Sequence, residues 1–508
     1  MQKTAPEKAR LLSRPSPLQR KQRRKNIFNG GNMEEKINTG TSPGSFKTIV
    51  YFICMVAALG GLLFGLDQGF IANSLETIEK YYQFGIKAGE NYSAILAVGG
   101  IIGALLSGIF ARFLGRKKSL ILAGFIFVTA SAYSALLPPI AVLSACRFFL
   151  GFAVGIASFI VPLYLSETAP AKIRGSMGTL FQLMITIGIF LISVTNVFIV
   201  RIFLNPATSL PLMFLTITLF AIFMFVGTFL IPESPRWLML KGKKDETLKV
   251  LKKTLNTQQE IDLEIKEIEE ALHGPKGAGI GIIFKGYFFK VLIVGVLLQM
   301  FQQLVGINMM IYYAPTIFGY AGIKGIIGMM TVPTVNMLFT FPAIFLVEKW
   351  GRKKLLYVGA ASMFITMVAS GIAFYMIGGT TDPSIITSLP KMVLLIAVIV
   401  YIFGFAVSWG PVVWLVCSEI FPLEGREVGM TITTMVNWTF AGLVMANALT
   451  FMQKFGNSSI FFVFGGFCIF AIIFVAMFVP ETKGITLEEL EFNLKSGKKL
   501  RDLGITNK

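Results

Sequence analysis

Two residues of opposite charge lie inside long apolar stretches. Asp67 is in the sequence LLFGLDQG, and Arg147 is in the sequence SACRFFLG. An ionisable side chain at the centre of a membrane helix costs roughly 3 kcal/mol or more, so such residues persist when they are paired or functional. Each lies about nine residues from the same-side end of its apolar stretch, which places both on the order of 14 Å deep. Equal depth and opposite charge predict an ion pair.

The expected pair has two interpretations. If a structural change separates the two helices, Asp67 can take up a proton, which is the physical requirement for proton coupling. If the helices never separate, the pair is a static lock between them. We favour the coupling role.

Uncharged amides form the second group of candidate residues. The sequence QMFQQLVGINMMIYYAP at 299–315 contains Gln302, Gln303 and Asn308. Their spacing does not place them on one helical stripe, but Gly306 and Pro315 loosen the helix. Amides donate and accept hydrogen bonds without charge, so this set suits a neutral ligand covered with hydroxyl groups.

Further candidates lie elsewhere in the apolar stretches. Asn437 and Gln182 add amides, and Asn336 is a weaker candidate. The rings of Trp414 and Trp438 offer flat apolar faces for a pyranose ring. The alternative for any one of these amides is a hydrogen bond between helices, but the whole set favours a polar binding site.

The composition identifies the medium around these residues. Of the 508 residues, 54% are apolar and 14% are charged, and the mean hydropathy is +0.71. A soluble domain carries about 25% charged residues, so a soluble enzyme, a nucleic-acid binder and a disordered protein are excluded. Twelve spans of about 20 residues use roughly 240 residues. We expect apolar spans at 47–76, 92–113, 119–137, 139–164, 175–200, 210–231, 288–313, 324–347, 354–377, 391–416, 428–451 and 458–479.

Basic loops define the orientation. The net charge is +19, and the loops RFLGRKK, KIRG and EKWGRKK and the segment 232–287 fall on one side. Positive charge marks cytoplasmic loops, so we expect both termini in the cytoplasm of a multi-pass protein of the cell membrane, inner or plasma. The basic run RKQRRK in the N-terminal tail is either a contact for anionic lipid or a solvated segment. Met33 offers a second start, which makes residues 1–32 a candidate start-site artefact.

The two halves of the chain repeat each other. FLGRKKSL returns as KWGRKKLL, GFAV occurs twice, and PESPRW returns as PETKG, at offsets of 236 to 253 residues. Two parallel repeats place a substrate site between them near the bilayer midplane. The expected organisation is a basic tail at 1–46, six-helix bundles at 47–231 and 288–480, and a cytoplasmic tail at 481–508. The linker at 232–287 is expected to contain two amphipathic cytoplasmic helices, in the stretches TLKVLKKTL and IDLEIKEIEEAL.

Charged residues at the inner helix ends also recur in both halves. We expect them to form an inner latch, a network of ion pairs that holds the bundles together when the inner side is shut. The alternative is snorkelling to the headgroups. The expected latch residues are Arg116, Glu167, Arg174, Glu348, Arg352, Glu419 and Arg426.

Residues for metal binding or catalysis are scarce. The single histidine, His273, lies in a charged segment, and the four cysteines lie in apolar stretches without metal-ligand spacing. We therefore expect no metal, no cofactor and no enzymatic activity.

These motifs resemble the sugar porter family of the major facilitator superfamily over about residues 46–490. The resemblance is carried by GLLFGLD, RFFLGFAVG, PLYLSETAP, PESPRWL, QQLVGIN, SWGPVVWLVCSEIFP and PETKG, and SMGTLFQLMITIGI looks most like bacterial galactose–proton symporters. It implies an all-α integral membrane protein with the major facilitator fold, twelve transmembrane helices in two six-helix bundles. It also implies roles for single residues: proton coupling for Asp67 and Arg147, sugar contact for Gln182, Gln302, Gln303, Asn308, Trp414 and Asn437, and outer gating for Tyr312 and Tyr313.

Three positions refine the resemblance. Ala111 stands where the family usually has an acidic residue, which leaves one member of the inner latch open. Ile189 replaces a glutamine of a xylose-type relative and argues weakly against xylose. Facilitative members generally lack a carboxylate at Asp67, so this residue favours symport.

The sequence therefore predicts a proton-coupled importer of a hexose of the galactose or glucose type. Its expected partners are the sugar, the proton and membrane lipid, and no nucleic acid. The alternatives are a facilitative sugar uniporter, a polyol or pentose symporter, a nutrient sensor, and an exporter of drugs or anions with the same fold.

Overall fold

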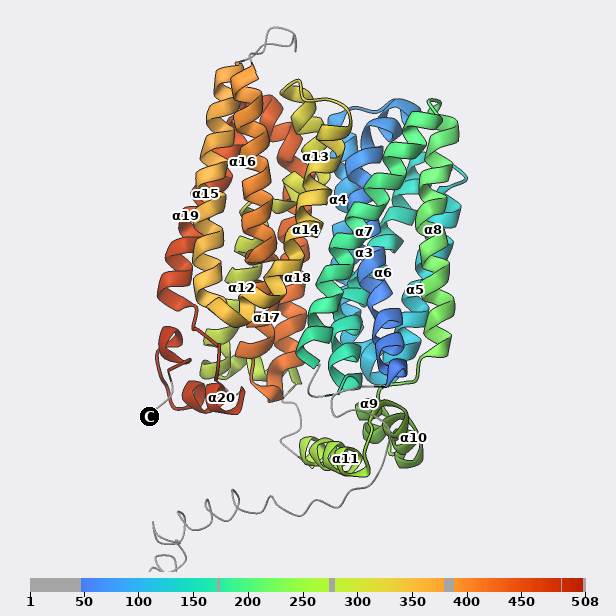
Figure 1. Ribbon diagram of the computed structural model, residues 1–508, viewed down its shortest axis with the longest axis vertical. Coiled ribbons are helices and arrows are strands. Elements are labelled where there is room, and N and C mark those ends of the chain that lie inside the picture. The colour runs from blue at the N-terminus through green and yellow to red at the C-terminus, as the bar shows by residue number, and fades with distance from the viewer. Residues whose placement is uncertain (1–46, 171–173, 274–278, 379–387, 486, 506–508) are drawn as a thin grey trace, which may run out of the picture. The chain divides into compact units, whose positions relative to one another are not determined.

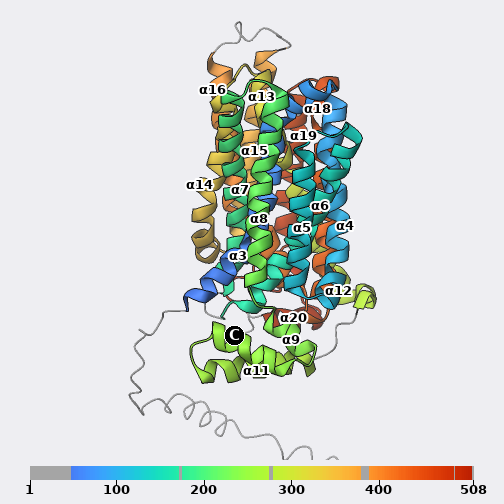
Figure 2. The same cartoon turned by 90° about the vertical axis from the view of Figure 1, so that its right-hand side faces the viewer.

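The structure is a computed structural model, and it describes residues 47–170, 174–273, 279–378, 388–485 and 487–505. The basic tail at 1–46 and its run RKQRRK lie outside the described residues, as does the side chain of Arg174. The described chain is helical, and its long helices stand side by side in two bundles (Figures 1 and 2).

The N-terminal bundle consists of α3 (Thr48–Tyr82), α4 (Ile86–Phe113), α5 (Arg116–Ser134), α6 (Ile140–Thr168), α7 (Arg174–Ile202) and α8 (Pro206–Leu230). Small residues let these helices approach closely. A Cβ atom on Gly65 of α3 would lie 1.9 Å from the backbone oxygen of Ile185, and one on Gly188 of α7 would lie 2.3 Å from that of Leu62. The glycines therefore set the contact between α3 and α7.

The C-terminal bundle contains two interrupted spans. Its helices are α12 (Gly286–Leu304), α13 (Ile307–Tyr320), α14 (Ile326–Trp350), α15 (Arg352–Ile377), α16 (Ser388–Val407), α17 (Trp409–Ile420), α18 (Arg426–Phe455) and α19 (Ser459–Phe478). The spans predicted at 288–313 and 391–416 are each two helices, α12 with α13 and α16 with α17. Gly306 adopts a φ of 99° at the first break, a conformation that other residues rarely adopt.

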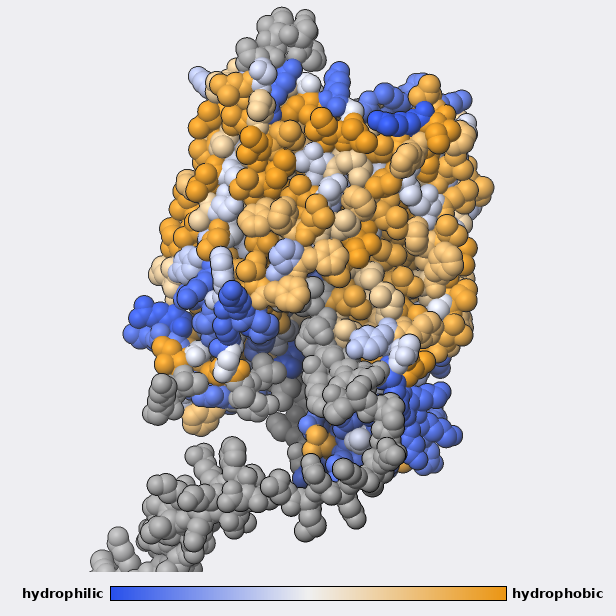
Figure 3. Space-filling view, viewed as in Figure 1, coloured by the Kyte–Doolittle hydropathy of each residue, from blue (hydrophilic) through white to orange (hydrophobic). Residues whose placement is uncertain are grey.

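Eleven segments of the described residues are long and apolar enough to span a membrane. The third predicted span, α5, is not among them, because its 19 residues begin with three basic side chains. It nevertheless packs against α6 and α8 and stands among the other helices of its bundle (Figure 1). Figure 3 shows an apolar surface along the sides of the bundles and hydrophilic residues at their ends. With each interrupted pair of helices counted as one span, each of the two bundles of the described chain has six spans.

Several helix ends differ from the predicted spans. The first span was predicted to end at 76, but α3 continues to Tyr82; the second was predicted to start at 92, but α4 begins at Ile86. The added turns contain glutamate and lysine, which are good helix formers, so the helices outlast the apolar run. Hydropathy alone marks the apolar run and misses these turns.

The polar segments are helical as well. The linker holds α9 (Pro235–Leu240), α10 (Lys244–Thr254), α11 (Gln258–His273) and the 3-10 turn η1 (Gly279–Phe284). The two amphipathic helices predicted in the linker match α10 and α11, which lie together at one end of the bundles (Figure 1). The turn η2 (Leu423–Gly425), the helix α20 (Leu487–Lys495) and the turn η3 (Leu500–Asp502) were not predicted.

The repeated PES and PET motifs have the same structural role. The carboxylate of Glu233 accepts hydrogen bonds from the backbone N–H groups of Arg116 (2.9 Å) and Lys117 (3.1 Å) at the start of α5. The carboxylate of Glu481 accepts from the first two N–H groups of α15, at 2.9 and 3.1 Å. A negative charge at a helix N-terminus satisfies unpaired donors and the helix dipole. Each motif thus caps one helix of its own bundle, at the end that carries the basic loops.

Candidate functional site

The two intramembrane charges form an ion pair. The Nη1 atom of Arg147 on α6 donates to Oδ1 of Asp67 on α3 at 2.6 Å, and the two residues are 1% and 0% exposed. The guanidinium carbon lies 5.8 Å from the ring centre of Tyr92 on α4. The contact predicted from equal depth is therefore present, and three helices of one bundle enclose it.

The pair is held by a single hydrogen bond. Within the described structure, Oδ2 of Asp67 and the Nε and Nη2 atoms of Arg147 are buried without a partner. A two-pronged arginine–carboxylate contact is stronger and more rigid. Breaking a buried pair leaves two unpaired charges and is costly, but a proton on Asp67 would remove one of them. The geometry is therefore suited to release of Arg147 when Asp67 is protonated.

The two predicted gate residues lie next to each other on α13, and Tyr312 is the one near this pair. Tyr312 and Tyr313 on α13 are 1% and 0% exposed, and α13 packs against α3 of the other bundle. Tyr312 lies within electrostatic range of both Asp67 and Arg147. Tyr313 donates its hydroxyl proton to the backbone oxygen of Met445 on α18 at 2.6 Å. Tyr312 thus lies near the ion pair on a helix of the other bundle, whereas Tyr313 bonds within the C-terminal bundle.

The amides at the end of α12 connect its break with the other broken span. The Nε2 atom of Gln302 donates to the backbone oxygens of Trp409 (2.7 Å) and Gly410 (3.2 Å) at the start of α17. These carbonyls belong to the first turn after the break between α16 and α17. One glutamine therefore joins the two interrupted spans of the bundle.

The same glutamine belongs to a chain of amides that continues in both directions. Asn437 on α18 donates through Nδ2 to Oε1 of Gln302 at 2.7 Å and to Oε1 of Gln299 at 2.6 Å. Across the break, Asn308 donates to Oε1 of Gln303 at 2.5 Å. The interruption at Gly306 brings Asn308 next to Gln303, which a continuous helix would not do. We call Gln299, Gln302, Gln303, Asn308 and Asn437 the amide network.

Gln299 was not among the predicted candidates. It is 0% exposed and stands three residues before Gln302, so both lie on one face of α12. That spacing is visible in the sequence QMFQQ and could have identified it. The network consists of buried groups that satisfy one another, and a hydroxylated ligand can replace each bond with an equivalent one.

The remaining predicted contacts lie outside the amide network. Gln182 on α7 and Trp414 on α17 are partly exposed, and Asn336 on α14 is buried. Trp438 is 3% exposed, and its ring centre lies 5.3 Å from that of Phe64 on α3. Its ring therefore packs between the bundles, and its role toward a sugar remains a prediction.

Trp409 and Ile189 are both buried and have structural roles. Trp409, which no prediction singled out, is 0% exposed and donates its indole N–H to the backbone oxygen of Leu356 at 2.9 Å. Ile189 is 2% exposed on α7, and its backbone lies against Gly69 of α3. Both residues support the helices around the site.

A set of contacts at the helix ends opposite the basic loops was not predicted from the sequence. Glu90 on α4 is 0% exposed. Its carboxylate accepts hydrogen bonds from the backbone N–H of Thr450 on α18, at 2.9 Å, and from the Thr450 hydroxyl. Lys87 donates to the backbone oxygen of Ala446 (2.5 Å) and to Oδ1 of Asn447 (3.2 Å). We call Lys87, Glu90, Asn447 and Thr450 the outer clamp, because they join the two bundles on the side opposite the basic loops.

The outer clamp escaped prediction for a simple reason. The second span was expected to begin at 92, so Lys87 and Glu90 fell between the first two predicted spans and were not considered. An acidic residue only two positions before an apolar run was the available signal. In the structure α4 extends to Ile86, and its first turns contact α18.

The predicted inner latch consists of two similar sets of contacts. Arg116 makes a two-pronged contact with Glu167, at 2.8 and 2.7 Å, and Nη1 of Arg116 donates to the backbone oxygen of Ala111 at 2.9 Å. Arg352 contacts Glu419 at 2.8 Å and, more loosely, Glu348 at 3.4 Å. These pairs lie within single bundles, so a latch between bundles remains a prediction.

Backbone carbonyls and hydroxyl groups make further hydrogen bonds to these charged residues. The position of Ala111, where an acidic residue was expected from the family, meets Arg116 through its backbone carbonyl. Arg426 donates to the backbone oxygen of Phe421 at 3.4 Å. Hydroxyl groups also support the two carboxylates, since Ser234 donates to Glu167 and Thr482 to Glu419, both at 2.5 Å.

Two membrane-spanning bundles, broken helices and a buried polar interior define a carrier of the major facilitator type. The sequence model for sugar (and other) transporters matches residues 53–494, and the chain belongs to this family. The galactose-proton symporter of Escherichia coli K12 is 38% identical over 464 residues, which is 91% of this chain and 97% of that protein. The arabinose-proton symporter of the same strain is 34% identical over 458 residues, or 89% and 95% of the two chains.

Solved structures show the same relationship. The proton:xylose symporter XylE of E. coli, bound to 6-bromo-6-deoxy-D-glucose, matches with a TM-score of 0.75 and 32% identity over 87% of this chain and 98% of that chain. This identity and coverage agree with the family assignment from the sequence. The protein is therefore a multi-pass membrane transporter.

Proposed function

We propose that this protein imports a sugar together with a proton across the plasma membrane, and that the sugar is a hexose of the galactose or glucose type. The observation that carries the proposal is the buried contact between Asp67 and Arg147, which is held by a single hydrogen bond of 2.6 Å. The names of the relatives, galactose-proton and arabinose-proton symporter, support proton coupling. The amide network supports a neutral, hydroxylated substrate.

The proposed mechanism is alternating access between the two bundles. Sugar binds at the amide network while the outer side is open, and Asp67 takes up a proton and releases Arg147. The bundles then rock, and sugar and proton leave on the inner side. Tyr312 and Tyr313 close over the site from α13 as the outer side shuts.

The outer clamp supports assignment of the described structure to a conformation closed on the outer side. Glu90 and Lys87 of one bundle bond to α18 of the other. The described pairs of Arg116 and Arg352 stay within single bundles. In the other half of the cycle, the inner charges would make the latch between the bundles.

The proposal includes an orientation. Both termini lie in the cytoplasm, because the loops with most lysine and arginine are on their side. Membrane lipid surrounds the apolar sides of the bundles. The excess of positive charge sets the orientation of the chain in the membrane and does not bind nucleic acid.

Uptake into proteoliposomes tests the coupling. With purified wild-type protein, an inward proton gradient should drive sugar above its external concentration, and an ionophore should abolish this accumulation. Asp67→Asn should lose accumulation and retain exchange of labelled for unlabelled sugar. Glu76→Gln is the matched control, because Glu76 is on the same helix in an exposed pair with Lys80.

Accumulation by Asp67→Asn would contradict the coupling role. Wild-type uptake that ignores the proton gradient would favour the alternative, a facilitative uniporter in which the ion pair is only structural. The second alternative, pentose transport, is favoured by relatives named for arabinose and xylose. Competition of labelled glucose by galactose, arabinose and xylose distinguishes it.

A further inference from the structure

The proposed uptake of a proton by Asp67 leaves a buried positive charge without its partner. Arg147 stays charged, because a guanidinium is not deprotonated in proteins, and its side chain is 1% exposed. Its one ion pair among the described residues is the contact with Asp67. A buried charge without compensation is strongly destabilising. Another group inside the bundle must therefore hold the guanidinium once Asp67 is neutral.

Tyr92 on α4 is placed to do this. It is 3% exposed, and the guanidinium carbon of Arg147 lies over its ring at 5.8 Å from the ring centre. A guanidinium within about 6 Å of the centre of an aromatic ring is attracted by the negative face of the ring. The Nε and Nη2 atoms of Arg147 have no hydrogen-bond partner in the described structure. Only the hydrogen bond from Nη1 to Asp67 therefore has to break before the guanidinium can settle on the ring.

Protonation of Asp67 strengthens the attraction between the ring and the guanidinium. Tyr92 lies within electrostatic range of both charges of the pair. While the carboxylate is charged, the ring face attracts the guanidinium and repels the carboxylate, and the two effects partly cancel. Once the carboxyl group is neutral, the attraction alone remains, in surroundings of low dielectric constant. The ring of Tyr92 therefore favours the protonated, released state over the ion pair.

The other groups around the ion pair leave its chemistry to these residues. Two tyrosines, Tyr92 on α4 and Tyr312 on α13, are in electrostatic range of both charges. They are uncharged at neutral pH, as are Tyr82 and Cys146, which are in range of Tyr92. The helices α7 and α8 of the same bundle meet α3 with isoleucine and phenylalanine side chains. Among the described residues, the carboxyl group thus titrates with the guanidinium as its one charged neighbour.

Tyr312 is the rival of Tyr92 for this role. Its hydroxyl oxygen is buried without a partner in the part of the chain that the structure describes, and it can accept a hydrogen bond from Arg147. It belongs to the C-terminal bundle, however, which moves relative to Arg147 in the proposed cycle. Tyr92 and Arg147 belong to the same bundle, so their contact can persist while the bundles rock. Of the two tyrosines, Tyr92 is therefore the better holder of the released charge.

We propose that the ring of Tyr92 receives the guanidinium of Arg147 when a proton releases it from Asp67. This inference rests on the proposed proton coupling and adds a positioning residue to it. The cation shifts its attachment from α3 to α4, whose first turns form the outer clamp with α18. Tyr92 thereby sets how readily Asp67 takes up a proton, without carrying the proton itself.

The pH dependence of sugar exchange tests this role. Purified full-length protein in proteoliposomes exchanges labelled for unlabelled glucose with the same pH on both sides, and the initial rate is measured over a series of pH values. The wild-type rate should fall as the pH rises and Asp67 loses its proton. In Tyr92→Leu the half-maximal rate should lie about one pH unit lower, which corresponds to about a tenfold loss of proton affinity. Tyr92→Phe keeps the ring and should match wild type.

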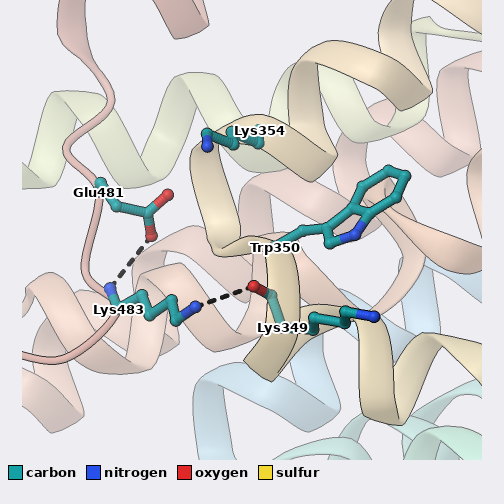
Figure 4. A pocket seen from close by; sticks show the side chains of 5 residues that line it. All are labelled: Lys349, Trp350, Lys354, Glu481 and Lys483. Atoms are coloured by element: carbon teal, nitrogen blue, oxygen red, sulfur yellow. Dashed lines mark hydrogen bonds between the residues drawn. The ribbon is translucent and has the colours of Figure 1, made fainter.

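Two control variants remove aromatic rings elsewhere. Tyr133→Leu changes a tyrosine on α5 of the same bundle that is 51% exposed. Trp350→Leu changes a ring at the end of α14 in the other bundle, in a pocket of about 440 Å³ that is also lined by lysine side chains (Figure 4). That ring lies among cations but belongs to no contact of the ion pair. Both controls should keep the pH of half-maximal rate of wild type.

The possible outcomes separate this inference from the proposed function. A Tyr92→Leu profile equal to that of wild type would overturn the inference. An equal shift in Tyr92→Phe would overturn it as well, since the hydroxyl and not the ring would then be responsible. A shift in Tyr312→Phe without one in Tyr92→Leu would assign the guanidinium to Tyr312. Wild-type exchange that ignores pH would overturn the proton coupling itself, and this inference with it.

A second substitution serves if Tyr92→Leu does not fold. Trifluorophenylalanine in place of Tyr92 nearly keeps the shape of phenylalanine, and its fluorine atoms withdraw the negative charge from the ring face that attracts a cation. The half-maximal rate should again move to lower pH relative to Tyr92→Phe. An unchanged profile in this well-packed variant would show that the ring does not hold the guanidinium.

Discussion

At the scale of single residues, the two bundles divide the chemistry between them. The charges, Asp67 and Arg147, both belong to the N-terminal bundle, and the whole amide network belongs to the C-terminal bundle. The tyrosines of α13 and the contact of Trp438 with Phe64 link the two regions. A change in one region can therefore reach the other through few side chains, which is what coupling requires.

The amide network yields a prediction for substrate affinity. Asn437→Ala should raise the sugar KM about 10- to 100-fold, because it removes a donor to both Gln299 and Gln302 and leaves the buried Oε1 of Gln299 without a partner. Initial rates of gradient-driven uptake over a range of sugar concentrations measure the effect. Thr439→Ala is the control, because the exposed Thr439 on the same helix bonds only to Met435 of its own turn. An unchanged KM would remove Asn437 from the site.

Some of these residues could be predicted from the sequence and others could not. Asp67 and Arg147 stand out because an ionisable group in hydrocarbon is costly, so depth and charge alone suffice to pair them. Asn308 and Gln303 could be named but not joined, because their contact depends on the break at Gly306. Glu90 was placed outside the membrane by its polar neighbours, although its partner on α18 is 360 residues away in the sequence. Such partners are set by packing and not by local pattern.

At the scale of helices, too, local sequence patterns predict some elements and miss those that depend on packing. The apolar runs predicted the spans, and the spacing in the linker predicted α10 and α11, because amphipathic periodicity is a local signal. The break between α16 and α17 at Ser408 has no glycine or proline at that position, unlike the break at Gly306. The short helix α20 was not predicted, since its nine residues are stabilised by contacts with other elements.

The docking of α20 yields a prediction for pH dependence. Glu424 in the turn η2 accepts hydrogen bonds from Tyr287 and Lys285 and pairs with Lys495 of α20 at 3.2 Å. The hydrogen bond from Tyr287, followed by the two lysines, lowers the pKa of Glu424 below its usual value of 4.5. A depressed carboxyl pKa stabilises the folded arrangement above the unfolded value, and this stabilisation is lost as pH falls through the folded pKa. The tail should therefore stay docked at neutral pH and loosen as the pH falls below the usual carboxyl value and through the lowered pKa of Glu424.

Hydrogen exchange measures this docking. Amides of residues 487–495 should exchange about tenfold faster in Glu424→Gln than in wild type at pH 7, since charged hydrogen bonds are lost. Wild type should show an increase of the same kind as the pH is lowered stepwise from neutral, after correction for the intrinsic exchange rate. Glu427→Gln is the control, because Glu427 is exposed and only three residues away. Equal exchange in both variants would mean that Glu424 does not hold the tail.

At the scale of the whole molecule, the sequence repeat accounts for the contacts that occur in both bundles. The outer clamp accounts for the contacts that join one bundle to the other. Each bundle has an arginine–glutamate pair and a capping glutamate at the end that carries the basic loops. The repeated sequence motifs predicted this equivalence. The outer clamp has no counterpart among the repeated motifs, so one side of the molecule is closed by contacts that are specific to α4 and α18.

Opening of the outer side should therefore depend on Glu90. Glu90→Ala removes two hydrogen bonds to a buried carboxylate, so the population that is open on the outer side should rise about 10- to 100-fold. The reporter is Ser93→Cys, one turn along α4, where Ser93 is 0% exposed. A membrane-impermeant thiol reagent added from outside should label this cysteine at least tenfold faster in the Glu90→Ala background. The four native cysteines are buried and give a low background. Glu76→Gln in place of Glu90→Ala should leave the rate unchanged, and an equal rate in both backgrounds would show that the clamp does not control the outer side.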